Sequence, residues 1–263
     1  MPKKKQEYGN DSISSLKGAD RVRKRPAVIF GSDGLEGCEH SFFEILSNSI
    51  DEAREGYGSL IEVTRYMDNS IEVRDHGRGI PLDYNEKEGR YNWELVFCEL
   101  YAGGKYDNNS GGMYEYSLGL NGLGACATQY SSEYMDVTVV RDKTKYTLRF
   151  EKGEVVGKLE KEPTRSIQTG TIQKWKPDME VFTDINIPIE FYKDTLNKQA
   201  MVNAGLKFVL YNETENGLEM FEYYYENGIT DYVKEAVGEE AFTTVESWEC
   251  ERTGRDREDK DDY

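Results

Sequence analysis

The sequence has 263 residues, enough for one large domain whose core needs neither disulfide bonds nor a structural metal ion. Its formal net charge of −17 excludes a chain that grips nucleic acid by its overall charge, because so acidic a surface repels phosphate. No stretch approaches the ~20 consecutive apolar residues of a membrane-spanning helix, which excludes that class as well.

The cysteines and the N-terminus indicate a reducing compartment. Cys38, Cys98, Cys126 and Cys250 are scattered without a C-x-x-C pair, so neither a zinc site nor a disulfide framework is expected. Residues 1–5 are mostly lysine and lead into no apolar run, which argues against a secretory signal. We therefore expect a cytoplasmic protein.

The N-terminal part predicts an arm followed by two helices. Residues 1–19 are polar and form the expected arm. A short helix is predicted from Asp20, as its cap, to Arg25, because Pro26 disfavours helical geometry in the residue before it. After a turn-rich loop over residues 31–37, the spacing predicts a long helix from Glu39 to Glu55, ended by glycines.

The remaining elements alternate in the manner of an α+β protein. Two alternating runs separated by Asp68-Asn69 predict a β-hairpin, and a later stretch, residues 102–125, contains seven glycines and is expected to be mobile. Many antiparallel neighbours favour a two-layer α/β sandwich with a mostly antiparallel sheet and helices on one face. Strands are predicted at 60–66, 70–75, 134–140, 145–150, 171–175, 206–211 and 218–225, and helices at 93–101 and 189–203.

The C-terminal residues suggest a domain boundary. A strand pattern at Thr243–Cys250 comes just before a charge-dense tail. We therefore expect one domain over residues 20–227 and the start of a second, truncated domain over 228–263.

The long helix carries one polar stripe that is open to two interpretations. At 100° per residue, Glu44, Asn48, Asp51 and Glu55 fall close together. The simple interpretation is the solvated face of an amphipathic helix. The functional one uses Asn48 as a neutral oxygen ligand of Mg²⁺, with Glu44, one turn away, accepting a proton from a water aimed at phosphorus.

Two glycine-rich segments are also ambiguous. Asp75 begins a D-x-G-x-G pattern at the end of a predicted strand, which is either a plain turn or a carboxylate that accepts a hydrogen bond from a purine amine beside bare backbone. Residues 102–105 and 117–125 are either a flexible linker or backbone N–H groups, with Lys105, for an anion. The G-x-x-x-x-G-K-[ST] phosphate loop is absent, and no βαβ unit surrounds the second segment.

The order of these motifs resembles one nucleotide-binding family. An acid–amide helix, D-x-G-x-G, a glycine-rich lid with lysine, and Thr169-Gly170-Thr171 follow one another as in the GHKL ATPases. Within that group the chain is similar to the B subunits of bacterial type II DNA topoisomerases, gyrase B and topoisomerase IV B. The similarity runs from about Tyr8 to Tyr225 and includes Arg23-Lys24-Arg25-Pro26.

The resemblance implies a role for each matching residue. Glu44 would be the general base and Asn48 the Mg²⁺ ligand, while Asp75 would read adenine with support from Thr171 through water. Tyr8, with Ile13, would reach the nucleotide of the partner protomer. The other implied ATP-binding residues are Asp51, Gly79, Ile80, Pro81, Lys105, Tyr114, Gly119, Leu120, Asn121, Gly122, Leu123, Gly124 and Ala125.

The implied mechanism is an ATP-driven dimer clamp for DNA strand passage. Its partners would be a topoisomerase A subunit, DNA held by other domains, and a second copy of this domain. The truncated domain expected over residues 228–263 would be the start of the transducer domain. The family's second-domain lysine has no counterpart before Tyr263, so weak hydrolysis is expected. Leu118 and Asn121 depart from the usual glycine and histidine. The alternative is a MutL-like or Hsp90-like GHKL clamp; a histidine kinase fits less well, because His40 and His76 are misplaced.

Overall fold

The computed structural model describes residues 15–102, 118, 122–238, 242–248 and 250. Its helices are α1 (Asp20–Arg23), α2 (Pro26–Phe30), α3 (Leu35–Arg54), α4 (Asn92–Cys98), α5 (Gly124–Tyr130), α6 (Ile189–Val202) and α7 (Ile229–Val237). Its strands are β1 (Leu60–Arg65), β2 (Ile71–Asp75), β3 (Tyr84–Asn85), β4 (Arg90–Tyr91), β5 (Ser132–Arg141), β6 (Thr144–Glu151), β7 (Glu154–Pro163), β8 (Gly170–Pro177), β9 (Lys207–Thr214) and β10 (Gly217–Tyr223).

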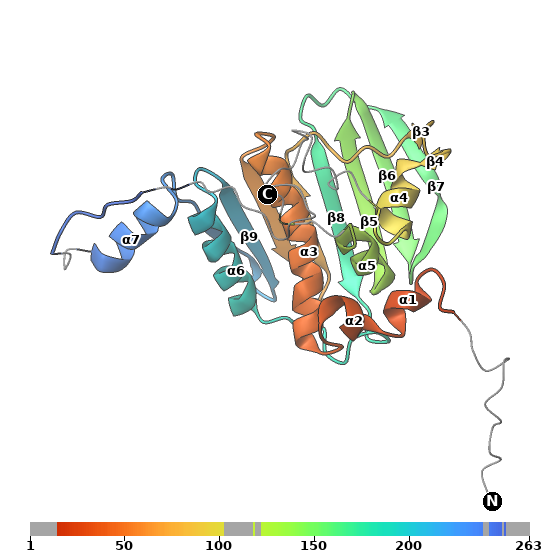
Figure 1. The fold of residues 1–263 in the computed structure, drawn as a ribbon, viewed down its shortest axis with the longest axis horizontal. Helices are drawn as coiled ribbons and strands as arrows, with labels where there is room; N and C mark the ends of the chain where they lie inside the picture. Colours follow the sequence, from red (N-terminus) through yellow and green to blue (C-terminus); the bar gives the residue numbers. More distant parts are fainter. Residues whose placement is uncertain (1–14, 103–117, 119–121, 239–241, 249, 251–263) are drawn as a thin grey trace, which may run out of the picture.

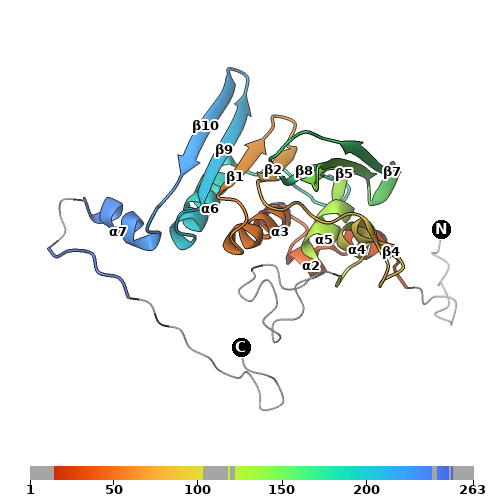
Figure 2. The same ribbon diagram turned by 90° about the horizontal axis from the view of Figure 1, so that it is seen from above.

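One large sheet organises the domain. Its eight strands follow the order β10-β9-β1-β2-β8-β5-β6-β7. Only β1 and β9 pair in parallel among the strand pairs of the described residues. Helices α3, α5 and α6 lie along one face of this sheet (Figures 1 and 2). The predicted α+β class, with a mostly antiparallel sheet covered by helices on one face, is confirmed.

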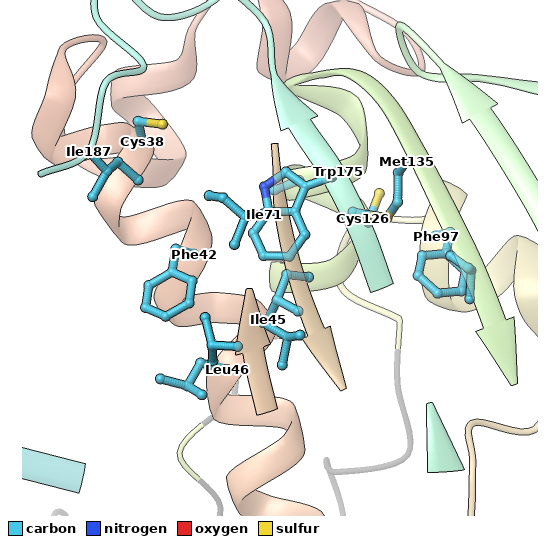
Figure 3. Close-up of a cluster of buried hydrophobic side chains, with 14 of the residues drawn as sticks. Cys38, Phe42, Ile45, Leu46, Ile71, Phe97, Cys126, Met135, Trp175 and Ile187 are labelled. Carbon is cyan, nitrogen blue, oxygen red and sulfur yellow. The ribbon is translucent and has the colours of Figure 1, made fainter. Parts of the chain in front are cut away.

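The core lies between α3 and the centre of the sheet. Phe42, Ile45 and Leu46 project from α3 toward Ile71 of β2 and Trp175 of β8 (Figure 3), and all five are at most 1% exposed. Burying a large apolar side chain contributes about 1.5–3 kcal/mol. This packing fixes the height and rotation of α3 on the sheet, and therefore sets where its polar stripe lies.

Two helix boundaries near the N-terminus differ from the prediction. Helix α1 has Ala19, and not Asp20, as its N-terminal cap, and it ends at Arg23, two residues before the predicted end. Pro26 is the first residue of α2, a position that suits proline because the missing N–H would be unpaired there. The long helix starts at Leu35 and not at Glu39, so Gly37, expected in a loop, lies in its first turn. Burial of Cys38 and Phe42 on the same helix outweighs the weak helix preference of glycine.

Arg23 fastens α1 to the rest of the domain. Its guanidinium donates to the Asp178 carboxylate at 2.7 Å and to the carbonyl oxygen of Tyr130 at 3.1 Å. The two side chains of the ion pair are 14% and 6% exposed. The pair is therefore largely shielded from water, and it joins α1 to α5 and to the residues just after β8.

The C-terminal strand prediction was wrong, and α2, α5, α7, β3, β4 and β7 were not predicted. Residues 243–248 and 250 form no strand in the described part of the chain, where no neighbouring strand pairs with them. Strand β7 was missed because nearly all its residues are exposed and carry no apolar alternation. The helix Ile229–Val237 was also missed. Within the described residues, no helix is long and apolar enough to span a bilayer.

Candidate functional site

The polar stripe of α3 is held in a defined arrangement. The Asn48 side-chain amide donates to the carbonyl oxygen of Glu44 at 3.0 Å, which fixes the amide one turn after that residue. One oxygen of the Glu44 carboxylate lies 3.1 Å from Nε2 of His40, one turn earlier. The stripe therefore places an imidazole, a carboxylate and an amide on three successive turns.

His40 was not singled out as a site residue from the sequence. Its other ring nitrogen lies 3.2 Å from the carbonyl oxygen of Phe30, so the ring is held at both ends. The hydrogen bond with Glu44 raises the pKa of His40, and partial burial opposes this shift. The i, i+4 spacing of His40 and Glu44 could have indicated this contact. The two contacts hold the imidazole in place, and the imidazole in turn orients the Glu44 carboxylate.

The start of α5 closes against this carboxylate. A methyl group added at Gly124 would lie 2.3 Å from Oε2 of Glu44 and 3.0 Å from its Cβ. A side chain is therefore excluded at position 124 unless Glu44 moves. The glycine that the sequence assigned to phosphate binding is thus packed directly beside the predicted general base.

Asp75 lies at the end of β2 within a network of three hydrogen bonds. One carboxylate oxygen accepts from the backbone N–H groups of Gly77 at 3.0 Å and Thr171 at 3.2 Å. The other accepts from the Ser49 hydroxyl at 3.2 Å. Burial raises the pKa of Asp75, and these three donors counteract the rise by stabilising the ionised form.

Ser49 joins the two halves of the site. It follows Asn48 on α3, and its bond to Asp75 brings the end of β2 against that helix. Glu44, Asn48 and Asp75 therefore belong to one continuous arrangement. Ser49 was missed from the sequence because nothing local shows which strand end will lie beneath it.

The loop after Asp75 is fixed by β8 and β5. A methyl group at Gly170, where φ is +149°, would lie 2.2 Å from the Asp75 carbonyl oxygen, so only glycine allows this approach. The Thr171 hydroxyl accepts from the N–H of Ile80 at 3.2 Å. Arg141 donates to the carbonyl oxygen of Gly79 at 2.9 Å. Thr171 thus supports Asp75 directly through its own N–H.

A second pair anchors the same loop to α3. Both carboxylate oxygens of Glu52 accept from the Arg78 guanidinium at 2.8 Å, and one also accepts from the Arg78 backbone N–H at 2.8 Å. The guanidinium carbon lies 3.8 Å from the ring centre of Tyr57. This bidentate contact gives the loop a rigid edge. None of the three residues was singled out as a site residue from the sequence.

The other predicted residues fall into two groups. Among those described, Asp51 is 1% exposed and accepts from the backbone N–H of Leu118 at 2.6 Å. Gly122 accepts from the N–H of Tyr101 at 3.1 Å. Leu123 caps α5, Ala125 packs against the core, and Pro81 is exposed. Outside the described residues lie Tyr8, Ile13, Lys105, Tyr114, Gly119, Leu120 and Asn121.

Known proteins share both the sequence and the fold. The DNA gyrase B protein of Thermotoga maritima is 38% identical over 235 residues, which are 87% of this chain and 35% of that protein. The Staphylococcus aureus gyrase B protein is 39% identical over 229 residues, 86% of this chain and 35% of that protein. The Synechocystis gyrase B protein is 38% identical over 227 residues, 86% of this chain and 21% of that protein. No protein-family model matches.

A solved structure supports the same relationship. The 43K ATPase domain of Thermus thermophilus gyrase B, solved with an aminocoumarin, superimposes with a TM-score of 0.71 at 31% identity. The match covers 85% of this chain and 56% of that one. The chain spans about a fifth to a third of the length of the gyrase B proteins it matches. It therefore contains a GHKL ATPase domain of the kind found in the B subunits of bacterial type II DNA topoisomerases.

Proposed function

We propose that this domain binds Mg²⁺–ATP between α3 and the end of β2 and hydrolyses it. The observation that carries the proposal is the hydrogen-bonded Asp75 carboxylate joined through Ser49 to the helix that bears Asn48 and Glu44. This arrangement offers an acceptor for a purine amine at one end and polar groups for a phosphate chain at the other.

Asp75 is the base-recognition residue of the proposal. Three donors already hold its carboxylate in place, so it needs no reorganisation to accept the amine of adenine. A keto group at the same position would place two acceptors against each other, which disfavours guanine. Gly79, Ile80 and Pro81 border the base and sugar.

Glu44 and Asn48 act at the phosphate end. Mg²⁺ prefers hard oxygen ligands and usually keeps several waters, so one amide oxygen from Asn48 together with phosphate oxygens fits its needs. When bound, the ion neutralises charge that develops on the phosphates. Glu44 takes a proton from the attacking water, and His40 holds the Glu44 carboxylate toward that task.

The domain serves as the ATP-driven clamp of a type II topoisomerase in this proposal. ATP binding favours a homodimer of the domain, other parts of the complex hold DNA, and a topoisomerase A subunit cleaves it. The net negative charge is consistent with an ATPase domain that does not itself bind DNA. The proposed location is the cytoplasm.

Calorimetric titration with a non-hydrolysable ATP analogue, with and without Mg²⁺, tests the proposal. We expect saturable one-site binding that Mg²⁺ strengthens, and markedly weaker binding of the matching GTP analogue. Equal affinity for the two purines would remove base recognition by Asp75. Absence of binding to either analogue would refute the nucleotide site.

A further inference from the structure

A buried glutamine lies beside the base-recognition residues. Gln173 is on β8, two residues after Thr171, and alternate residues of a strand project to the same face. Its neighbours across the sheet are Val73 of β2 and Val137 of β5. Since Val73 is two residues before Asp75, Gln173 lies in the row directly next to that of Asp75 and Thr171.

The side-chain oxygen of Gln173 lacks a partner. The residue is 2% exposed, and its Oε1 accepts no hydrogen bond within the described part of the chain. Its flanking residues Val73 and Val137, 2% and 0% exposed, have no polar side-chain atoms to offer. A buried acceptor without a donor lowers the stability of the fold. Because both neighbours across the sheet are valines, an apolar side chain at position 173 would be more favourable for packing than glutamine.

Asp75 can accept only one of the two N–H groups of a purine amine. An exocyclic purine amine has two N–H groups, and the Asp75 carboxylate already accepts from Ser49, Gly77 and Thr171. It can take one N–H of the amine on the oxygen that Ser49 contacts. The second N–H needs another acceptor on the same face of the sheet.

We propose that Gln173 is a second base-recognition residue for 6-aminopurine nucleotides. Its Oε1 accepts the N–H that Asp75 does not take, directly or through one ordered water. The inference rests on the proposed function, because it assumes that the purine lies against Asp75. It adds a specificity-determining residue that has no charge and that local sequence patterns do not reveal.

The test is Gln173→Val, which replaces the amide with the residue type already on both sides. The matched control is Ile172→Val, on the other face of β8. Each protein is titrated with a non-hydrolysable ATP analogue and with the corresponding purine nucleotide that lacks the amine, and its thermal unfolding is recorded without ligand.

Wild type and the control should prefer the adenine analogue by about 10–150-fold, as expected when a charged acceptor binds the amine. Q173V should lose about 3–10-fold in affinity for the adenine analogue only, the usual worth of one neutral hydrogen bond. Its unfolding temperature should be equal to or higher than that of wild type, because an unpaired buried oxygen is removed.

Three results would overturn the inference. Equal weakening of both nucleotides in Q173V would indicate a purely structural role for the glutamine. Unchanged discrimination in Q173V would remove Gln173 from base recognition while leaving Asp75 in place. If wild type itself does not distinguish the two nucleotides, base recognition at Asp75 fails, and the inference fails with it.

Discussion

Replacing Asp75 with asparagine separates base recognition from folding. In the structure one Asp75 oxygen accepts two backbone N–H groups, and an asparagine oxygen can accept both. The asparagine NH₂ then takes the place of the oxygen that faces Ser49. The Ser49 hydroxyl can rotate to accept from it. A purine amine, however, would meet a donor where it needs an acceptor.

The expected loss follows from the hydrogen bond removed. A hydrogen bond to a charged group contributes about 1.5–3 kcal/mol, which corresponds to roughly 10–150-fold in affinity. Calorimetry with a non-hydrolysable ATP analogue should show this loss for Asp75→Asn. The analogue without the amine should bind wild type and D75N with similar affinity, because it makes no bond to that oxygen.

The folded protein should tolerate the change. Burial raises the pKa of Asp75 above its unfolded value, so the stability linked to this carboxyl is fully present below the unfolded pKa. It is lost as the pH rises through the folded pKa. At neutral pH, D75N should therefore be as stable as wild type or more stable, and this pH dependence should disappear. Equal ATP affinity in D75N and wild type would refute the reasoning, as would a loss of affinity explained by unfolding.

Three further predictions concern hydrolysis and stability. Glu44→Ala should lower ATP turnover by roughly 10²–10⁴ with analogue binding retained, and unchanged turnover would exclude Glu44 as the base. Gly124→Ala should also slow turnover, because the added methyl group would lie only 2.3 Å from Oε2 of Glu44 and would push the carboxylate aside. Turnover equal to that of wild type would contradict this packing. Arg23→Met should lower the free energy of unfolding by about 2–4 kcal/mol in denaturant titration, because it leaves the Asp178 carboxylate shielded without its partner. Although burial opposes it, the Arg23 hydrogen bond holds the pKa of Asp178 below its usual value, so the stabilisation from this ion pair should be lost as the pH falls. If Arg23→Met lowers the free energy of unfolding by less than about 0.5 kcal/mol, as for an exposed ion pair, the Arg23–Asp178 contact does not stabilise the fold as inferred.

Much of the secondary structure was predictable because the spacing of apolar residues along the sequence indicates it. Alternation on both sides of Asp68-Asn69 predicted the β1–β2 hairpin, and the observed register pairs Arg65 with Ile71 around that turn. The helical spacing likewise predicted most of α3, and Leu46 and Ile50, four residues apart, are both buried on it. Such patterns depend on contacts between residues close in sequence, which propensity and periodicity describe well.

The parts that failed depend on neighbours distant in the chain. A strand needs a partner, so the apolar alternation at Thr243–Cys250 did not produce one in residues 243–248 and 250. Strand β7 forms although it has almost no buried residues, because β6 offers it a free edge. Local residue preferences contain no information about whether such an edge is available.

Some residues of the candidate site were indicated by local sequence patterns, and others only by contacts between distant parts of the chain. The sequence by itself determined the stripe that carries Glu44 and Asn48, since helical periodicity places residues four apart on one face. It also determined Asp75 at a strand end before glycines. Only the tertiary structure decided that Ser49 and Thr171 hold the Asp75 carboxylate, because these contacts span 26 and 96 residues. Contacts of that length are set by how α3 and β8 pack against β2, and no local pattern specifies that packing.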